Sequence, residues 1–514
     1  MMKSTRLTVT QKDIHGFKGD LLVFCALKRE NKLPWCDDEI ISMVTHAHEL
    51  GDFSGKEDET FLFYPEQTHM TPEFSARRVL VLGLGTEKEL ADDITAREAF
   101  RKAGGVIAKA VEKIKAGNIM IRIPTLAICP FEDMGECLAE GVVLGNYRFD
   151  KYKKEKPEED RYKGLKEIKL FSEQNQNELK KGTKKGGMAA RAACLARNMA
   201  NEPGNGWTAS DFAAYASKLA ETYQFKLSVL NTADMKQLGM GGILAVNQGS
   251  TEPSKMVILE YRPTGKNETL LLVGKGVTFD SGGVSLKQAP GMEEMKYDMC
   301  GGAAVLAAME AVGREKPKLG VVAIIPATDN MAGGGAVKPG DIIRHYDGTT
   351  SEIVNTDAEG RMILADALAY GIKTFNPTCV VDIATLTGAA IMGLGHHYSC
   401  VLSNNDALVQ RLEDAGKRTG EPMWRLPLGK EYSKQIESKV ADIKNIGGKS
   451  AGTITAAAYL EHFVGKTPWA HLDIAGTAWN FTEKSYIPKG PSGMGVRTFI
   501  DLIRNWKKGV VGLN

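Results

Sequence analysis

Three short segments of this 514-residue chain combine charged side chains with glycines and apolar residues, and they constrain the fold most strongly. The first follows the apolar run 270–273 and contains Lys275 and Asp280. The second begins at Asp298. The third has the sequence Asn-Thr-Asp-Ala-Glu-Gly-Arg and occupies residues 355–361. A fold that suits this chain must bring these charges to a place where they are neutralised.

These charges cannot be buried without partners. They comprise four acids, two lysines and one arginine, which are Lys275, Asp280, Lys287, Asp298, Asp357, Glu359 and Arg361. An unneutralised carboxylate inside a protein costs several kcal/mol. Divalent metal ions are the natural neutralisers, and two ions would use all four acids. Taken singly, each residue is more often a helix cap or a solvated surface charge, so the prediction depends on their joint occurrence.

The surrounding pattern predicts that the three segments converge. An apolar run that ends at a glycine is typical of a buried strand, which places Lys275 and Asp280 on the loop beyond it. Asp298 precedes the helix-favouring run 299–309, where a helix N-terminus stabilises negative charge. A second helical run, 362–368, follows the third segment. In an open parallel sheet, the loops after the carboxyl ends of the strands meet in one crevice.

Strands and helices alternate along the chain, which predicts an α/β protein with two domains. Residues 1–165 are expected to form a smaller N-terminal α/β domain, 166–195 a connecting segment with a helix at 188–198, and 196–514 a larger C-terminal domain. The charged stretch 151–160 indicates a surface loop near the first boundary.

Apolar periodicity gives the expected elements of each domain. The N-terminal elements are strands 21–25 and 79–85 and a helix over 95–115. The C-terminal strands are 256–261, 270–273, 321–326 and 379–385, with helices at 303–314 and 362–373. This alternation predicts a mixed, mostly parallel sheet flanked by helices in the larger domain.

Composition argues against several classes of protein. Hydrophobic residues make up 43% of the chain and charged residues 25%, as in ordinary globular proteins, and no apolar run is long enough to span a membrane. The formal net charge of +2 gives little support for a nucleic-acid partner, although it leaves one open. Eight cysteines are scattered singly and no secretory signal is evident, so we expect a cytoplasmic protein with reduced thiols.

The charged segments also match a known pattern. Residues 355–361 carry every position of the signature of the leucyl aminopeptidase family, and the chain resembles these two-metal exopeptidases. The other matching motifs are 273–283, 295–304, 382–389, 442–448 and 469–479. The resemblance implies a hydrolase that releases N-terminal residues from short peptides, preferably leucine and other bulky apolar residues, through a water activated by two metal ions. It also implies a homohexamer, in which the N-terminal domain serves assembly and shields the site.

The resemblance implies a metal ligand role for five residues. Asp280 and Glu359 would bridge both ions. Lys275, as a neutral amine, and Asp298 would complete one site, and Asp357 would complete the other. Carboxylate ligands favour Mn²⁺ or Mg²⁺, whereas the resemblance implies Zn²⁺ with Mn²⁺ or Co²⁺ able to exchange, so the metal stays open between Zn²⁺ and Mn²⁺.

The resemblance also implies which residues act on the substrate. Lys287 would hydrogen-bond the scissile carbonyl, and Arg361 would hold a bicarbonate ion as general base. The predicted substrate-binding residues are Met295, Thr385, Leu386 and Gly388. Among them, the carbonyl of Leu386 would accept a hydrogen bond from the leaving amine or from the substrate N–H, and Met295 would line the pocket for the first side chain.

Three alternatives belong beside this interpretation. A DNA-binding regulator is one, since some bacterial relatives combine that duty with peptidase activity. A metal-free structural relative is another, although it would be expected to lack Asp280, Lys287 or Glu359, and all three are present. A cysteinylglycine dipeptidase could use the same site.

Overall fold

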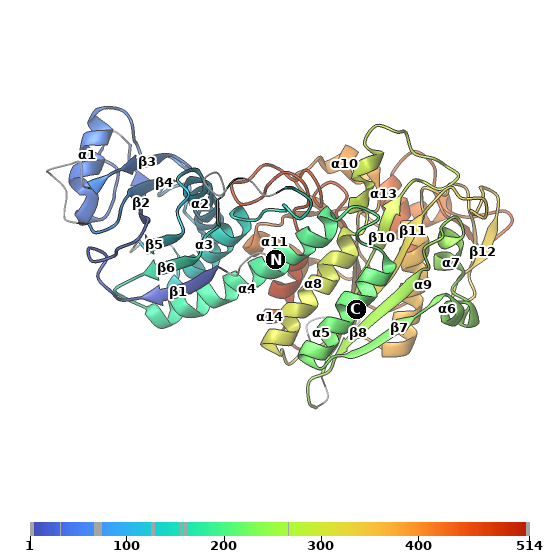
Figure 1. Cartoon of the computed structure of the whole chain (residues 1–514). Coiled ribbons are helices and arrows are strands. Elements are labelled where there is room, and N and C mark those ends of the chain that lie inside the picture. Colours follow the sequence, from blue (N-terminus) through green and yellow to red (C-terminus); the bar gives the residue numbers. More distant parts are fainter. Residues whose placement is uncertain are drawn as a thin grey trace. The chain divides into compact units, whose positions relative to one another are not determined.

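The computed structural model describes residues 5–30, 32–65, 74–124, 129–154, 157, 162–265 and 267–509. The chain divides into two compact units (Figure 1). The first unit comprises Met1–Arg191 and Glu483–Pro488, and the second comprises Ala192–Thr482 and Lys489–Asn514. A short piece from late in the sequence therefore groups with the N-terminal residues.

The first unit is built on a six-stranded sheet in the order β1-β6-β5-β2-β4-β3. Its strands are β1 Arg6–Thr10, β2 Leu21–Lys28, β3 Thr60–Phe63, β4 Val79–Thr86, β5 Asn118–Arg122 and β6 Glu167–Phe171. All neighbours run parallel except β3, which pairs antiparallel with β4 at one edge. The predicted strands 21–25 and 79–85 are confirmed as β2 and β4, which are apolar and almost completely buried because helices cover both faces.

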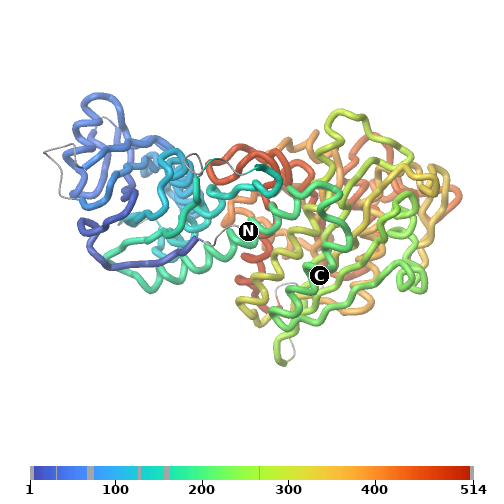
Figure 2. Tube along the Cα trace, viewed as in Figure 1, coloured from blue at the N-terminus to red at the C-terminus, as the bar shows by residue number. Residues whose placement is uncertain are grey.

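Those helices come from the blue and cyan parts of the chain in Figure 2. They are α1 Ile41–Glu49, preceded by the short η1 Asp38–Ile40, α2 Asp93–Lys113 and α3 Phe131–Gly145. Leu21 and Val23 of β2 belong to the core with α2 and α3, whereas Leu22 and Phe24 belong to the core with α1. This alternation follows from the two-residue period of a strand. The predicted helix over 95–115 is confirmed as α2.

The second unit contains a nine-stranded sheet in the order β16-β15-β18-β14-β9-β11-β8-β7, with β10 paired to β11 beside that path. Its strands are β7 Lys226–Leu230, β8 Lys255–Tyr261, β9 Thr269–Gly274, β10 Gly276–Asp280, β11 Gly320–Asn330, β14 Cys379–Ala384, β15 Ser399–Ser403, β16 Met423–Arg425 and β18 Trp469–Asp473. The central strands β11, β9, β14 and β18 run parallel. Antiparallel pairs join β8 to β11, β7 to β8 and β15 to β18, so the predicted mixed, mostly parallel sheet is confirmed.

Helices flank both faces of this larger sheet. α8 Cys300–Glu315 packs on one face, where Gly302 approaches Ile325, and α9 Gly360–Phe375 packs on the other, where Gly371 approaches Leu271. The remaining helices are α5 Ala209–Tyr223, α6 Thr232–Leu238, α7 Gly241–Asn247, η4 Met292–Tyr297, α10 Gly388–Leu394, α11 Asp406–Thr419, α12 Lys430–Gln435, α13 Gly452–Glu461 and α14 Val496–Arg504. The predicted helices at 303–314 and 362–373 are confirmed as α8 and α9.

The helix α4 Gln176–Asn201 begins in the first unit and ends in the second. It contains the predicted connecting helix 188–198 but is longer, because the preceding stretch 180–185, which contains four lysines, is helical too. Lys181 and Lys185 of that stretch lie 2.7 and 2.5 Å from carboxylate oxygens of Glu132. Half of the charged stretch 151–160, for which a surface loop was predicted, lies outside the described residues.

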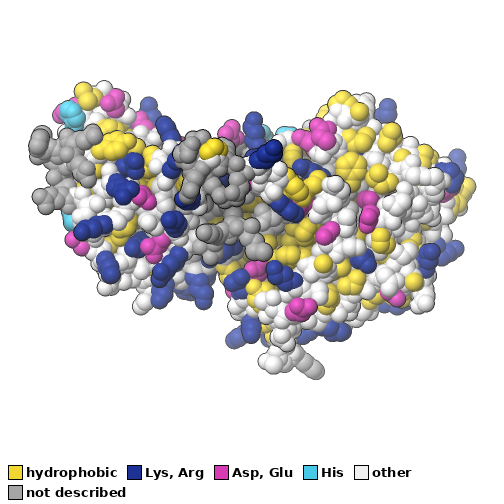
Figure 3. All heavy atoms as spheres, in the orientation of Figure 1, with side chains coloured by type: hydrophobic (Ala, Val, Ile, Leu, Met, Phe, Trp, Pro, Cys, Tyr) yellow, Lys and Arg dark blue, Asp and Glu magenta, His cyan; other side chains and the backbone are white. Residues whose placement is uncertain are grey.

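The second unit also contains a small three-stranded sheet. β12 Ile342–Arg344, β13 Thr350–Glu352 and β17 Ile443–Lys444 form the small sheet. On the face of this unit drawn in Figure 3, acidic and basic side chains are interspersed among hydrophobic ones. Within the part of the chain that the structure describes, no helix has the length and apolar character needed to cross a membrane.

Candidate metal centre

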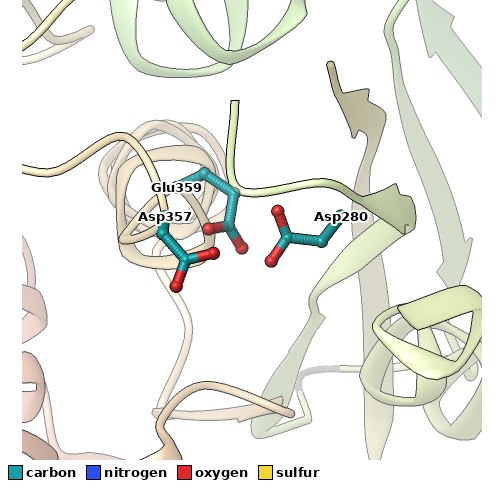
Figure 4. Close-up of side chains that lie close together, drawn as sticks. All are labelled: Asp280, Asp357 and Glu359. Carbon is teal, nitrogen blue, oxygen red and sulfur yellow. The ribbon is translucent and has the colours of Figure 1, made fainter. Parts of the chain in front are cut away.

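Three acidic side chains meet in the second unit, at the carboxyl end of a strand and the start of a helix. Asp280 ends β10, Glu359 directly precedes α9, and Asp357 lies in the turn before it. One carboxylate oxygen of each residue lies within 4.8 Å of one oxygen of each of the other two. Figure 4 shows the three carboxylates facing one another. The sheet topology therefore brings together acids that are distant in the sequence, as the strand-end argument predicts.

Lys275 connects a fourth acid to this group. Its ammonium nitrogen lies 2.7 Å from Asp298 Oδ2 and 2.8 Å from Glu359 Oε1. Asp298 lies in the turn between η4 and α8, so it precedes a helix as predicted. All three side chains are buried. Two buried carboxylates thus share one buried ammonium group.

Lys287 makes the corresponding contacts on the more exposed side. Its ammonium nitrogen lies 2.8 Å from Asp280 Oδ2 and 2.5 Å from Asp357 Oδ1. The side chain of Lys287 is 23% exposed and that of Asp357 is 33% exposed. The site is therefore deep at Lys275 and open toward solvent at Lys287, which gives a substrate a way in.

The predicted loop after β9 is wrong in one respect. Gly276–Asp280 form the short strand β10, which pairs parallel with β11 and places Asp280 opposite Asn330. β11 extends beyond the end of β9, so its edge remains free to pair with the next stretch of chain. A strand holds Asp280 more firmly than a loop would, because its backbone hydrogen bonds fix the direction of the side chain.

The pKa values of the acids reveal a shortage of positive charge. Burial raises the pKa of Asp280, Asp298 and Asp357, and neighbouring carboxylates add to each increase. Burial alone would lower the pKa of Lys275, but Asp298 and Glu359 outweigh it and raise this pKa. Four carboxylates thus share two ammonium groups, and the acids are only partly compensated.

A divalent cation fits this set of donors. Glu359 Oε2 is buried and has no hydrogen-bond partner among the residues that the structure describes. Its carboxylate belongs to the group with Asp280 and Asp357, so a cation held there would relieve the repulsion between the acids and could satisfy the free oxygen. Hard oxygen donors of this kind suit Mg²⁺, Mn²⁺ and Zn²⁺. Lys275 could join the ligands only after its ammonium group loses a proton.

Two glycines make room for this arrangement. A Cβ atom on Gly360 would lie 2.6 Å from Lys275 Cε, so any other residue there would displace the lysine. Gly282 has a φ of +86°, which L side chains rarely adopt, and a Cβ atom there would lie 2.8 Å from Asp357 Oδ1. Both positions therefore require glycine for the acids and the lysine to meet.

Several residues that hold the acids in place were not predicted from the sequence. Asn330 donates to Asp280 Oδ1 over 2.9 Å and to the carbonyl of Thr356 over 3.0 Å. Ser285 and Thr356 cross-link the two acidic loops, with each main-chain N–H donating to the other residue's hydroxyl, at 2.8 and 3.1 Å. Asn330 ends β11, whose core was predicted as a strand, so the rule that parallel strands converge at their carboxyl ends could have identified it.

Arg361 lies in the first turn of α9 and has no acidic partner among the described residues. Its Nη1 donates to the carbonyl of Asn445 over 2.8 Å, while its buried Nε has no hydrogen-bond partner in the described part of the chain. Burial lowers the pKa of this guanidinium. A buried guanidinium with an unused donor is suited to binding a small anion.

A cavity of about 360 Å³ opens beside Lys287. Its apolar walls include Met295, Ile391 and Trp479, and Glu294, His396 and Asn480 add polar groups. The structure thus places Met295, one of the four predicted substrate-binding residues, at this cavity. The mixture of large apolar walls and a few polar groups is typical of a small-molecule site.

The other three predicted substrate-binding residues lie after β14. Thr385 is turned toward the acids: its hydroxyl donates to Asp298 Oδ1 over 2.8 Å, and its carbonyl accepts from Lys275 Nζ over 3.0 Å. The N–H of Leu386 donates to Asp473 Oδ1 over 3.2 Å, and Gly388 begins α10.

Two family models match the chain. The model of the cytosol aminopeptidase family's catalytic domain matches residues 194–500, and the model of the family's N-terminal domain matches residues 23–156. A probable cytosol aminopeptidase of Desulforapulum autotrophicum is 61% identical over 97% of both chains. The chain belongs to the cytosol aminopeptidase family. It is therefore a metal-dependent aminopeptidase and a hydrolase.

Other relatives cover nearly the whole aminopeptidase. A probable cytosol aminopeptidase of Desulfotalea psychrophila is 55% identical and covers 95% of this chain and 97% of its own. The solved structure of the bottromycin maturation enzyme BotP in complex with Mn is 33% identical, with a TM-score of 0.82 over 95% of this chain and 99% of that chain. Both units of the aminopeptidase are thus included in the similarity.

Proposed function

We propose that this aminopeptidase removes the first residue of short peptides and prefers leucine and other bulky apolar side chains. The observation that carries the proposal is the buried group of carboxylates, one oxygen of which lacks a partner, next to Lys287 and a largely apolar cavity. Metal ions explain the charges, and the cavity explains a preference for apolar side chains.

Lys275, Asp280, Asp298, Asp357 and Glu359 are the residues that would hold two divalent cations. Such ions, when bound, would supply a Lewis acid for the peptide carbonyl and an acidified water near neutral pH. Asp280 and Glu359 are central in the cluster, which suits residues that would contact both ions. Lys275 would have to release its ammonium proton as it changes from a partner of carboxylates to a ligand.

Lys287 and Arg361 would act on the substrate side of this centre. Lys287 is a cation at the open edge, so its ammonium group can donate a hydrogen bond to the carbonyl oxygen as negative charge develops there. Arg361 has a buried Nε without a partner among the described residues, which supports its proposed role of holding bicarbonate. No histidine appears in the group of acids, so a base held by arginine is consistent with the residues present.

The cavity beside Lys287 would receive the first side chain. Met295, Ile391 and Trp479 offer apolar contact for a leucine side chain. The carbonyl of Leu386, on the loop that also holds Asp298 and Lys275 through Thr385, is the proposed acceptor for the N–H of the scissile peptide. Gly388, the first residue of α10 after that loop, would leave room for the peptide backbone.

Hydrolysis of leucine p-nitroanilide tests the proposal. Protein stripped of metal should be inactive, and addition of Mn²⁺ or Zn²⁺ should restore turnover. The matched control is N-acetyl-leucine p-nitroanilide, which has the same side chain but no free amine and should not be cleaved. Equal cleavage of both substrates would overturn the assignment as an aminopeptidase, and faster cleavage of the glycine or aspartate p-nitroanilide would overturn the apolar preference.

The resemblance also supports a homohexamer that acts in the cytoplasm, with the first unit serving assembly. Light scattering coupled to size-exclusion chromatography should give about six times the chain mass of 55.8 kDa. A monomer or dimer that is fully active on leucine p-nitroanilide would contradict the assembly but not the peptidase activity.

A further inference from the structure

Asp473 is a buried carboxylate of the second unit. It ends β18 next to the last residue of β14, Ala384, in the parallel register of these strands. Asp473 is 1% exposed. None of the lysines, arginines and histidines that the structure describes forms an ion pair with it. A buried carboxylate needs hydrogen-bond donors, so the donors of Asp473 show which parts of the chain it holds.

Those donors all come from the rim of the proposed substrate site. Asp473 Oδ1 accepts from the N–H of Leu386 over 3.2 Å and from the N–H of Ala475 over 3.1 Å. Asp473 Oδ2 accepts from the hydroxyl of Thr387 over 2.6 Å. Ala475 lines the cavity beside Lys287, so this one carboxylate ties a cavity wall to the loop after β14.

The hydroxyl of Thr387 also connects Asp473 to α10. Thr387 Oγ1 accepts from the N–H of Ala390 over 3.2 Å and therefore caps the helix, and it also lies 2.7 Å from Thr453 Oγ1. α10 carries Ile391, another residue of the cavity wall. Because the proton of Thr387 goes to Asp473, Thr453 must donate to Thr387.

We propose that Asp473 is a positioning residue. By accepting from the N–H of Leu386 and from the hydroxyl of Thr387, it fixes the peptide plane between these two residues. The Leu386 carbonyl is thereby aimed at the N–H of the scissile peptide. With both the preceding N–H of Leu386 and the following side chain of Thr387 held by one carboxylate, the carbonyl between them has little freedom to rotate. This inference rests on the proposed function, in which the Leu386 carbonyl binds that N–H.

A comparison of an amide with an ester tests the role directly. Leucinamide has an N–H at the scissile bond, whereas leucine methyl ester has an oxygen there and offers nothing to the Leu386 carbonyl. In the metal-loaded enzyme, Asp473→Ala should lower kcat/KM for leucinamide about tenfold more than for leucine methyl ester, because one aimed hydrogen bond is lost. A general loss of structure would lower both values by the same factor.

Two further variants serve as matched controls. Asp473→Asn keeps an oxygen for the N–H groups of Leu386 and Ala475 and can donate to Thr387, so its ratio of amide to ester hydrolysis should stay within about threefold of the parent protein. Thr453→Ala removes a hydroxyl from the same network without touching Leu386, and its ratio should be unchanged. Metal content is measured for every variant.

Each outcome decides the matter. A selective loss on the amide that Asn restores supports the inference, whereas equal losses on both substrates, or no loss, overturn it. If Asp473→Ala does not fold, Asp473→Ser replaces it, since its shorter side chain cannot reach the N–H of Leu386. Failure of the parent protein to cleave either substrate would instead refute the proposed function, so the two failures are distinguishable.

Discussion

The two units each bury a cluster of charges, and the clusters differ in balance. In the first unit, Arg101 lies 2.6 Å from Glu98 and 2.7 Å from Glu140, and Lys484 lies 2.8 Å from Glu98. The hydroxyl of Tyr486 donates to Glu98 over 2.8 Å. Two acids thus face two bases. In the second unit, four carboxylates face two lysines.

The pKa values follow this difference. Burial alone would raise the pKa of Glu98, but Arg101 and Lys484 outweigh it and lower the value to about 2. At the candidate metal centre, burial and neighbouring acids instead raise the pKa of Asp280 and Asp298. A balanced cluster stabilises the fold, whereas a cluster with excess acid is a place where cations belong.

The largest effect is expected for Glu359→Ala. The change removes the acid with the unpartnered buried oxygen, so bound metal should be lost and turnover of leucine p-nitroanilide should fall by about a thousandfold or more. Elemental analysis and steady-state kinetics measure the two effects. Glu431→Ala, at an exposed glutamate of α12, is the control and should change neither. Full turnover by the Glu359 variant would refute its role in metal binding.

The second largest effect is expected for metal removal, which should lower the free energy of unfolding. Cations that bind only the folded state add about 2.7 kcal/mol of stability at a hundred times their Kd. Chelation should therefore lower the unfolding temperature, and Mn²⁺ should restore it, because the excess acids are again neutralised. In the Glu359→Ala variant Mn²⁺ should have little effect. An equal gain in both proteins would mean that the stabilising ions bind elsewhere.

Glu98→Gln tests the balanced cluster. The folded pKa of Glu98 is about 2, below its ordinary value of 4.5, so its stabilisation is present above pH 4.5 and is lost as the pH falls toward 2. The variant should lose about 2 kcal/mol of unfolding free energy at neutral pH, and the difference from the parent protein should shrink on acidification. Denaturant unfolding at several pH values measures this.

The control for this variant is Asp150→Asn in the same unit. Asp150 and Lys153 form a pair whose side chains are 54% and 75% exposed, so its loss should be close to neutral. A pH-independent loss in Glu98→Gln would contradict the proposed origin of the stabilisation. Its turnover at low temperature should match that of the parent protein, because Glu98 lies outside the candidate site.

The smallest effect is expected for Arg361→Ala. Metal content should be unchanged, since the guanidinium contacts none of the carboxylates, and kcat should fall about tenfold through loss of the held anion. Arg361→Lys should not restore the rate, because an ammonium group lacks the planar fork. Loss of metal from Arg361→Ala would show that the residue supports the acids instead.

Much of the architecture could be predicted because its signals are local. Apolar runs such as 79–85 and 270–273 predict buried strands directly, and helix-favouring runs predict α8 and α9. The strand β10 was missed because its sequence, Gly-Val-Thr-Phe-Asp, has no long apolar run and pairs only where β11 extends past β9. β7, which lies at the sheet edge and is only partly buried, was also missed.

The candidate site divides in the same way. Sequence spacing and motif resemblance named the charged residues, because charged groups beside apolar runs need neutralising partners wherever they occur. They gave no role to Asn330 or to Asp473, which lies within the matching motif 469–479, because the importance of such a residue depends on what lies next to it. Partners of this kind are distant in the sequence, and the folded sheet brings them together at the ends of its strands.

By itself, then, the sequence determined the most apolar strands and helices, among them β2, β4, β9, α8 and α9, and the supply of four acids, two lysines and an arginine. Only the tertiary structure decided that Lys275 is shared by Asp298 and Glu359, that one oxygen of Glu359 is left without a partner, and that Asp473 joins the loop after β14 to the cavity wall. The physical reason is that element type depends on nearby residues, whereas charge balance depends on distances of a few ångströms between residues that only the folded sheet brings together.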